Sequence, residues 1–400
     1  MTEGALPQAP LTGEAIPLIE PEIRGNEWKY VQECLETGWV SSAGPFVDRF
    51  EHMVAHQCGC QRAVATVNGT SALHVALLVA GVQPDDEVLV STLTFIAPVN
   101  AIRYVGAWPV FVDAEPDYWQ MDPARVVDFL EKECRWSNGT LYDQRTGRRV
   151  SAIVPVHALG HPVDLDPIVT AARKFGLKVI EDATEGLGAT YRGRPLGSIG
   201  DIGCLSFNGN KIITTGGGGM LVTSNEEWAE KAKYLTTQAK DDPIEYIHKE
   251  IGYNYRLTNI QAAIGCAQME QLDTYVAAKR EIADRYCLAL RDISGIVPMR
   301  QASWAKSTFW MYTVLINEKK VGIDSRQLLQ ALAAQNIQCR PLWQPIHRSP
   351  AHVLSRAGDL PVSEQLSKEA LSLPCSVGLS RDAQHKVIDQ VCQMLNSVRT

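Results

Sequence analysis

The chain has 400 residues, with 45% hydrophobic and 21% charged side chains, a composition typical of a globular protein long enough for two domains. Its formal net charge of −7 argues against a broad nucleic-acid-binding surface. No apolar run reaches the length of a membrane span, and residues 1–15 lack the basic start and apolar core of a secretory signal, so we expect a cytoplasmic protein.

Two helices are predicted near the N-terminus, after a loose tail that covers residues 1–20. The first helix runs from residue 22 to residue 38 and carries apolar side chains near helical spacing. A loop separates it from a second helical stretch over residues 45–58. A short strand is predicted next, over residues 62–67.

This strand leads directly into Asn-Gly-Thr-Ser, where a helix is predicted from Ser71 to Ala80 with Thr70 as its N-cap. The free backbone N–H groups and the dipole of a helix N-terminus attract a phosphate group. The pattern therefore indicates either an anion site at Gly69 and Thr70 or an ordinary turn and cap. This segment by itself favours the ordinary turn.

Strands and helices then alternate as far as Asp182. The alternation predicts an α/β fold with a mostly parallel sheet that is covered on both faces, and ligands of such sheets gather at the carboxyl ends of the strands. Gly69, His157 and Asp182 all fall at such ends, which favours one shared site. The predicted strands are 87–91, 109–113, 152–156 and 178–181, the predicted helices are 95–105 and 166–175, and residues 134–150 are a surface excursion.

A single lysine, Lys211, stands between two predicted strands, 203–207 and 220–223, with a run of four consecutive glycines before the second strand. A phosphate-binding Walker loop is excluded, because that motif needs glycines before the lysine and Ser or Thr directly after it. Two interpretations remain open. The stretch is either a β-hairpin with a flexible connection or the site of a lysine that condenses with an aldehyde as a Schiff base.

Asp182 closes a predicted strand 211 − 182 = 29 residues before Lys211. A carboxylate that faces a lysine is the arrangement pyridoxal phosphate (PLP) requires, because the carboxylate keeps the pyridine nitrogen protonated. The alternative is that Asp182 caps a helix. The presence of Gly69, Thr70 and Ser71 upstream makes that alternative less favoured.

The second half of the chain changes character. Helical patterns dominate residues 261–290, and a short strand at 311–316 and a helix at 325–334 follow. We therefore expect a large domain over residues 21–269 and a smaller α+β domain over residues 270–400. The ten cysteines include no CxxC pair, so the sequence predicts no metal site and no redox motif.

Seven segments of the chain resemble the DegT/DnrJ/StrS family of PLP-dependent sugar aminotransferases, in the family's order and over most of the chain. The resemblance implies PLP fold type I, the fold of aspartate aminotransferase, with PLP as the cofactor. The segments are Asn68–Leu73, Thr92–Ala97, Pro155–Gly160, Glu181–Glu185, Ser206–Lys211, Thr214–Gly219 and Tyr253–Ala263.

The resemblance also implies catalytic and phosphate-binding residues. Lys211 would hold PLP covalently and, once freed, would act as the general base, while Asp182 would pair with the pyridinium. The backbone of Gly69 and Thr70 and the hydroxyl of Ser206 would hold the phosphate.

Four further positions follow from the same resemblance. Phe95 would stack on the pyridine ring, with plain core packing as the alternative. Glu185 and Asn208 stand where many members of the family have Gln and His, and Glu185 would lie near the phenolic oxygen of the cofactor. Asn254 matches an asparagine that reaches the phosphate from the partner subunit, so the resemblance implies a homodimer with shared active sites.

Within the family, four segments resemble those of perosamine synthases and of aminotransferases of the legionaminic-acid pathway, namely Gly38–Ser42, Asn208–Lys211, Leu235–Lys240 and Arg340–His347. This implies transfer of an amino group from L-glutamate to a nucleotide-linked 4-keto-6-deoxyhexose, for surface-glycan or nonulosonic-acid biosynthesis. The first expectation is a UDP-2-acetamido-2,6-dideoxy-4-keto-hexose, and the alternative is GDP-4-keto-6-deoxymannose. The residues expected to contact the sugar nucleotide, with core or domain packing as their alternative role, are Trp39, Ser41, Trp343 and His347. His157 is also expected at the site, with a histidine whose hydrogen bonds are satisfied internally as the equally weighted alternative.

Two other functions are considered for the same fold. Sugar dehydratases of the family replace the Schiff-base lysine with histidine, so the presence of Lys211 argues against dehydration. A non-catalytic regulator that senses a sugar or PLP is the other alternative. The intact pair of Asp182 and Lys211 makes it less favoured, because a sensor needs no proton-shuttling lysine.

Overall fold

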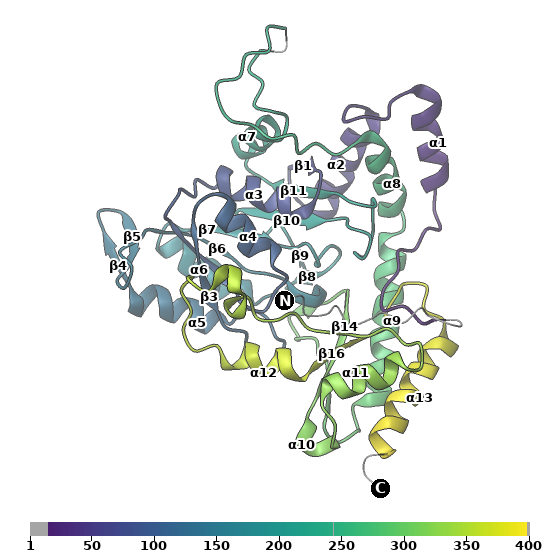
Figure 1. The fold of residues 1–400 in the computed structure, drawn as a ribbon. Helices are drawn as coiled ribbons and strands as arrows, with labels where there is room; N and C mark the ends of the chain where they lie inside the picture. The colour runs from purple at the N-terminus through teal and green to yellow at the C-terminus, as the bar shows by residue number, and fades with distance from the viewer. Residues whose placement is uncertain (1–14, 243, 398–400) are drawn as a thin grey trace, which may run out of the picture.

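The computed structural model describes residues 15–242 and 244–397 and is built around a seven-stranded sheet (Figure 1). Strand β11 runs antiparallel to both of its neighbours, and the other four pairings are parallel. The mostly parallel mixed sheet expected from the sequence is therefore confirmed. In order across the sheet, the strands are β1 (Arg62–Thr66), β11 (Gly219–Thr223), β10 (Ile202–Ser206), β7 (Lys178–Asp182), β6 (Val150–Val154), β2 (Glu87–Ser91) and β3 (Trp108–Val112).

Helices cover both faces of this sheet. One face carries α3 (Gly69–Val79), α4 (Ala97–Tyr104) and α7 (Glu226–Thr236), and the other carries α2 (Pro45–Cys58), α6 (Leu165–Lys174) and α8 (Asn259–Met269). Successive side chains of a strand point to opposite faces. In β1, Val64 accordingly packs into the core on the α3 side, whereas Ala63 and Ala65 pack into the core on the α2 side. The strands are largely apolar because both faces are buried, although β7 ends in Glu181 and Asp182 and β2 begins at Glu87.

Two predicted segments differ in detail. Helix α1 (Glu27–Thr37) begins later than residue 22, because the Glu27 carboxylate accepts the Gly25 N–H at 2.7 Å and holds the preceding turn outside the helix. The surface excursion contains a hairpin of β4 (Cys134–Ser137) and β5 (Thr140–Asp143), so it is more regular than expected. It follows α5 (Pro123–Asp128) and a π-helical turn at Phe129–Glu133.

The later part of the chain forms a second, antiparallel sheet of four strands. Within residues 15–242 and 244–397, no helix is both long and apolar enough to cross a bilayer. We keep residue 270 as the proposed start of a smaller domain around this sheet. Its elements are α9 (Leu272–Leu290), β12 (Ile296–Pro298), β14 (Tyr312–Ile316), α10 (Glu318–Val321), α11 (Ser325–Ala333), β15 (Arg340–Pro341), α12 (Pro361–Glu369), β16 (Ala370–Leu373) and α13 (Arg381–Ser397), and a small sheet of β8 (Thr190–Tyr191), β9 (Arg194–Pro195) and β13 (Ala305–Lys306) lies alongside.

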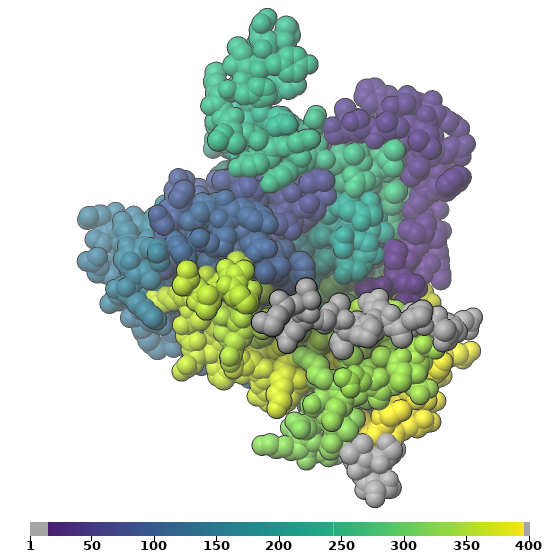
Figure 2. All heavy atoms as spheres, in the orientation of Figure 1, coloured from purple at the N-terminus to yellow at the C-terminus, as the bar shows by residue number. Residues whose placement is uncertain are grey.

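Two segments far from each other in sequence, around Ile16 and around Arg356, each pair with a distant part of the chain. Ile16 is buried and pairs with Ile337 near the second sheet, so residues 15–20 are not the loose tail that was predicted, and residues 1–14 lie outside the described part. In the segment before α12, Arg356 pairs with Val110 of β3, and its carbonyl accepts the Phe111 N–H at 2.9 Å. Figure 2 shows these late residues, in yellow-green, against the blue surface of the first part.

Candidate active site

The strand ends converge at one edge of the seven-stranded sheet. Thr66 of β1 and Ser206 of β10 are both paired with Gly219 of β11, and Cys204 of β10 is paired with Asp182 of β7. The loops that follow β1, β7 and β10 therefore leave the sheet side by side. This edge is where the sequence predicted a shared site, and it is the usual ligand-binding edge of parallel sheets.

A cavity of about 390 Å³ opens at this edge, a volume suited to a small organic ligand. It is lined by residues from six separate stretches of the chain. The lining residues are Asn68, Gly69, Thr70, Leu73, Phe95, Ala97, Thr184, Glu185, Ser206, Asn208, Asn210, Lys211, Trp310 and Trp343.

Lys211 lies in the loop between β10 and β11, which pair antiparallel, so the predicted β-hairpin is present, and Lys211 also lines the cavity. Its predicted role as a Schiff-base lysine stays a prediction. Its backbone N–H donates to the Asn208 carbonyl at 2.9 Å, which fixes the start of the loop. Its Nζ donates to Glu185 Oε1 at 3.4 Å and lies 4.2 Å from the centre of the Trp310 ring. The amine is thus a partly buried donor inside the cavity.

Glu185 faces this amine from the loop after β7. Its other carboxylate oxygen accepts the Leu159 N–H at 2.8 Å. Burial raises the pKa of Glu185, and the nearby Lys211 amine and the Leu159 N–H act in the opposite direction. The side chain is therefore held at both oxygens, one by the backbone and one by the lysine.

Asp182 is the last residue of β7 and is only 2% exposed. It is not among the cavity-lining residues, although Thr184 and Glu185 of the same loop are. Its carboxylate accepts the Thr184 N–H at 3.1 Å. Burial raises the pKa of Asp182, opposed by its contacts with Thr184 and by Lys211. A buried carboxylate in this environment is suited to a cationic partner, and a pyridinium nitrogen is such a partner.

The N-terminus of α3 provides a cradle for an anion. The helix begins at Gly69, and Asn68 rather than the predicted Thr70 is its cap, because the Asn68 side chain accepts the Ser71 N–H at 2.8 Å. The first N–H groups of a helix have no acceptor within the helix, so those of Gly69 and Thr70 are oriented to bind an anion. Together with Ser206 they fit the phosphate of PLP.

Close packing at Gly69 leaves no room for a side chain. A Cβ atom there would lie 2.9 Å from Ser206 Cβ and 3.2 Å from Thr184 Cγ2. We expect Gly69→Ala to displace the cradle and to weaken PLP binding by roughly tenfold or more, the loss of one or two hydrogen bonds to a charged group. Titration of the cofactor-free protein with PLP measures this. Gly358→Ala is the matched control, because a Cβ there meets no atom within 4 Å. Equal affinity in both variants would argue against the cradle.

Of the remaining predicted contacts, the structure brings Phe95 and Trp343 to the cavity. Phe95 is 56% exposed, so plain core packing does not explain it. The predicted helix began at Phe95, whereas α4 begins at Ala97, so Phe95 precedes the helix.

His157 does not line the cavity, which corrects its prediction as a substrate contact. Its side chain is fully buried, with Nε2 3.0 Å from Glu181 and Nδ1 accepting the Val163 N–H at 3.1 Å. Both ring nitrogens are therefore occupied. The alternative weighed from the sequence, a histidine whose hydrogen bonds are satisfied internally, describes it.

Three other predicted contacts also lie outside the cavity lining. His347 bonds Thr92 at 2.8 Å and Glu364 at 3.1 Å, and so joins the C-terminal part to the end of β2. Trp39 and Ser41 lie against the start of α8, where their carbonyls accept the side-chain and backbone N–H groups of Asn259. These contacts lie within one chain, and the predicted role of the three residues in binding the sugar nucleotide stays a prediction.

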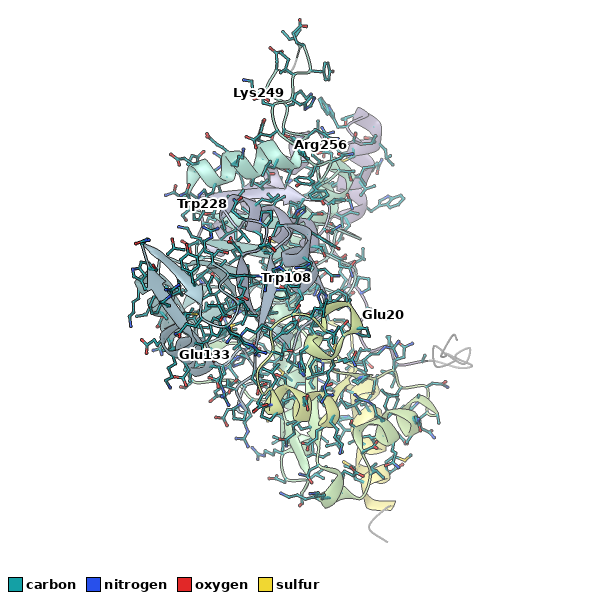
Figure 3. The ribbon with its side chains drawn as sticks, turned by 60° about the vertical axis from the view of Figure 1, so that its left-hand side comes forward. Glu20, Trp108, Glu133, Trp228, Lys249 and Arg256 are labelled. Atoms are coloured by element: carbon teal, nitrogen blue, oxygen red, sulfur yellow. The ribbon has the colours of Figure 1, made fainter. Side chains whose placement is uncertain are left out.

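Asn254 is exposed and lies outside the cavity of its own chain. It pairs with Thr237 at the base of a segment that projects from the body between α7 and α8 (Figure 1). Figure 3 shows Lys249 on this projecting segment and Arg256 at its base. Asn254 therefore does not line the cavity of its own chain, and its contribution to the phosphate site of a partner subunit stays a prediction.

The sequence reasoning missed Trp310. Its indole ring lines the cavity and covers Lys211, although it lies about a hundred positions further along the chain and has no motif around it that predicts a ligand. Among the described residues, no group of three or more His, Cys, Asp or Glu side chains is placed to hold a metal ion.

Comparison with known proteins agrees with this geometry. The model of the DegT/DnrJ/EryC1/StrS aminotransferase family matches residues 21–392. GDP-perosamine synthase of Caulobacter vibrioides is 39% identical over 381 residues, 95% of this chain and 98% of that protein. EpsN of Bacillus subtilis, whose name describes a pyridoxal phosphate-dependent aminotransferase, is 38% identical over 385 residues, 95% of this chain and 96% of that protein.

Among solved structures, the aminotransferase TlmJ of Streptoalloteichus hindustanus has a TM-score of 0.87 at 27% identity, covering 96% of this chain and all of that one. The fold is therefore PLP fold type I, as expected. The residues around the cavity supply a lysine, a buried carboxylate and a phosphate cradle, which are the groups that PLP needs. The chain belongs to the DegT/DnrJ/EryC1/StrS family and is a PLP-dependent sugar aminotransferase.

Proposed function

We propose that the protein transfers the amino group of L-glutamate to C4 of a nucleotide-linked 4-keto-6-deoxyhexose. The observation that supports this most is that Lys211 lines the same cavity as the N-terminus of α3. The similarity to GDP-perosamine synthases over nearly the whole chain favours a GDP-linked sugar. The UDP-linked 2-acetamido sugar, expected first from the sequence, has no comparable support and becomes the second arm of the test.

The proposed roles follow the geometry of the site. When bound, PLP supplies a carbonyl that takes up the amino group and a ring that withdraws electrons from the reacting carbon. Gly69, Thr70 and Ser206 bind its phosphate, and Asp182 holds a proton on its ring nitrogen. Lys211 Nζ removes the proton from Cα of the donor and later delivers a proton to C4 of the sugar.

Glu185 has a separate proposed role in holding the lysine. Its carboxylate lies 3.4 Å from Lys211 Nζ and is fixed by the Leu159 N–H. This directs the amine toward the cavity rather than into solvent. Trp343, which lines the same cavity, is proposed to contact the sugar, because aromatic rings pack well against sugar faces. Phe95, which also lines the cavity, keeps its proposed place against the pyridine ring of PLP.

A panel of GDP- and UDP-linked 4-keto-6-deoxyhexoses tests the proposal, with L-glutamate as donor and formation of 2-oxoglutarate as the readout. Turnover with the GDP-linked sugar alone supports the proposal, and turnover with the UDP-linked sugar alone overturns the choice of nucleotide. If PLP binds but no member of the panel reacts, the aminotransfer proposal fails and the regulator alternative gains support. Omission of the sugar controls for slow glutamate turnover.

We further propose a homodimer in which each chain lends Asn254 to the partner's phosphate site. The projecting segment carries large apolar side chains in solvent, with Ile244 82% and Ile251 83% exposed. Such exposure is unfavourable unless another surface covers it. A second copy, related by a twofold axis, would cover both segments at once and bring each Asn254 toward the opposite cavity.

Mixing two inactive variants tests the shared site. Lys211→Ala chains and Asn254→Asp chains are each expected to be inactive, the second because its carboxylate repels the phosphate. After subunit exchange, about half of the dimers are mixed and each holds one intact site, so about a quarter of wild-type activity should return. Native mass spectrometry monitors the exchange. No activity in a mixture with confirmed exchange, or full activity of a monomer, would contradict the proposal.

A further inference from the structure

The contacts of Trp310 go beyond filling space. Its side chain is only 3% exposed, yet it lines the cavity, and it comes from the stretch just before β14 in the second part of the chain. Its Nε1–H donates to the Asn210 carbonyl at 2.7 Å. The face of its ring lies 4.2 Å from Lys211 Nζ. One side chain thus touches both the backbone of the lysine loop and the reactive amine.

The segment that carries Trp310 is itself fixed to the first part of the chain. The Gly160 carbonyl accepts the Thr308 N–H at 3.1 Å and the Ser307 hydroxyl at 2.9 Å. Gly160 has φ +83°, and a Cβ there would lie 2.3 Å from Thr308 Oγ1, so this approach requires glycine. The position of the indole ring is therefore set by a tight junction and not by the cavity alone.

The contacts on the two sides of the Lys211 amine lead back to the same pair of residues, 159 and 160. Leu159, next to Gly160, donates its N–H to Glu185, and Glu185 accepts from Lys211. The amine is held between a carboxylate and an aromatic face, and both are anchored at residues 159 and 160. Nothing in the proposed proton transfers requires the indole, so its placement needs another explanation.

We propose that Trp310 is a positioning residue for Lys211. The indole N–H fixes the loop at Asn210, and the negative face of the ring attracts the amine when it is protonated. Together they limit the orientations of the lysine side chain to those that point into the cavity, which lowers the entropic cost of its proton transfers. This inference rests on the proposed role of Lys211.

Two substitutions separate the two contacts. Trp310→Phe keeps an aromatic face and removes the N–H, whereas Trp310→Leu removes both. Trp304→Phe is the matched control, because Trp304 lies in the same stretch but packs edge-on against Tyr118 and Tyr191, away from Lys211. The first measurement is hydrogen exchange of the backbone amides over residues 207–213 in the protein freed of PLP. The second is kcat and KM for the amino donor in the loaded enzyme.

We expect faster exchange over residues 207–213 in both Trp310 variants and unchanged exchange there in Trp304→Phe. We expect kcat to fall by roughly fivefold in Trp310→Phe and roughly thirtyfold in Trp310→Leu, with KM within about twofold of wild type. Faster exchange spread over the whole chain, with KM and kcat changed together, would mean a merely structural residue and would overturn the proposal. So would wild-type exchange and kcat in both variants.

The exchange measurement uses no sugar and no glutamate, so its result does not depend on the proposed substrate. If no sugar of the panel reacts but residues 207–213 still exchange faster in both Trp310 variants, the substrate proposal fails while the positioning of the lysine loop stands. If the panel reacts and neither variant differs from wild type, the opposite conclusion follows.

Discussion

Lys211→Ala is expected to lower aminotransfer by about 10⁴-fold or more, because the variant loses both the amine that holds the cofactor and the group that moves the proton. The glutamate half-reaction, monitored by the visible absorption of bound PLP, measures this loss. The circular dichroism spectrum should match that of wild type, since the side chain lies in a cavity and not in a core.

Removing the lysine also leaves the buried Glu185 carboxylate without its partner, so a second variant is needed. Lys211→Arg keeps the positive charge near Glu185 but cannot condense with an aldehyde, and we expect it to be equally inactive. Lys306→Ala, a change at an exposed lysine, is the control and should leave turnover unchanged. Activity above about a tenth of wild type in either Lys211 variant would show that another group moves the proton.

Asp182→Asn is expected to retain PLP and to lose roughly a hundredfold or more in rate. An amide of nearly the same shape still fills the buried site at the end of β7, so the fold should persist. It cannot hold a proton on the pyridine nitrogen, and the loss of that charge-assisted bond costs a few kcal/mol in the transition state. The measurements are single-turnover rates with glutamate and the PLP content of the purified variant.

The matched control for this change is Asp117→Asn, because Asp117 is exposed on a loop. Its rate should equal that of wild type. If Asp182→Asn stays within twofold of wild type, the carboxylate has no part in the chemistry. If the variant loses PLP altogether, Asp182 acts in binding the cofactor, and the prediction that PLP is retained while the rate falls is wrong.

Much of the fold could be predicted from the sequence because its signals are local. Alternation of apolar strands with amphipathic helices marked the seven-stranded sheet, and helix α2 has the bounds expected for it. The junction at Asn68 was also located, although its cap was assigned to Thr70. A side chain two positions away can cap a helix that begins two residues later, and only the geometry of the turn decides between them.

The rest depended on contacts between distant parts of the chain. His157 follows a strand at the ligand-binding edge, which favours a site residue, but its ring turns inward to Glu181. Trp310, which lies just before β14, was not singled out from the sequence. Its place over Lys211 is set by the junction at Gly160, and no local pattern in the sequence reveals a junction between residues so far apart.

The pairings of Ile16 with Ile337 and of Val110 with Arg356 affect the order in which a growing chain can fold. All strands of the seven-stranded sheet lie between Arg62 and Thr223, so this sheet can form on the ribosome before the second sheet has been made. Its edge strand β3 lacks a hydrogen-bond acceptor for the Phe111 N–H until Arg356 has been made. Until then β3 presents an open edge, the kind of surface that recruits strands of other chains. Ile16, which is made before the seven-stranded sheet, likewise lacks this pairing until Ile337 emerges.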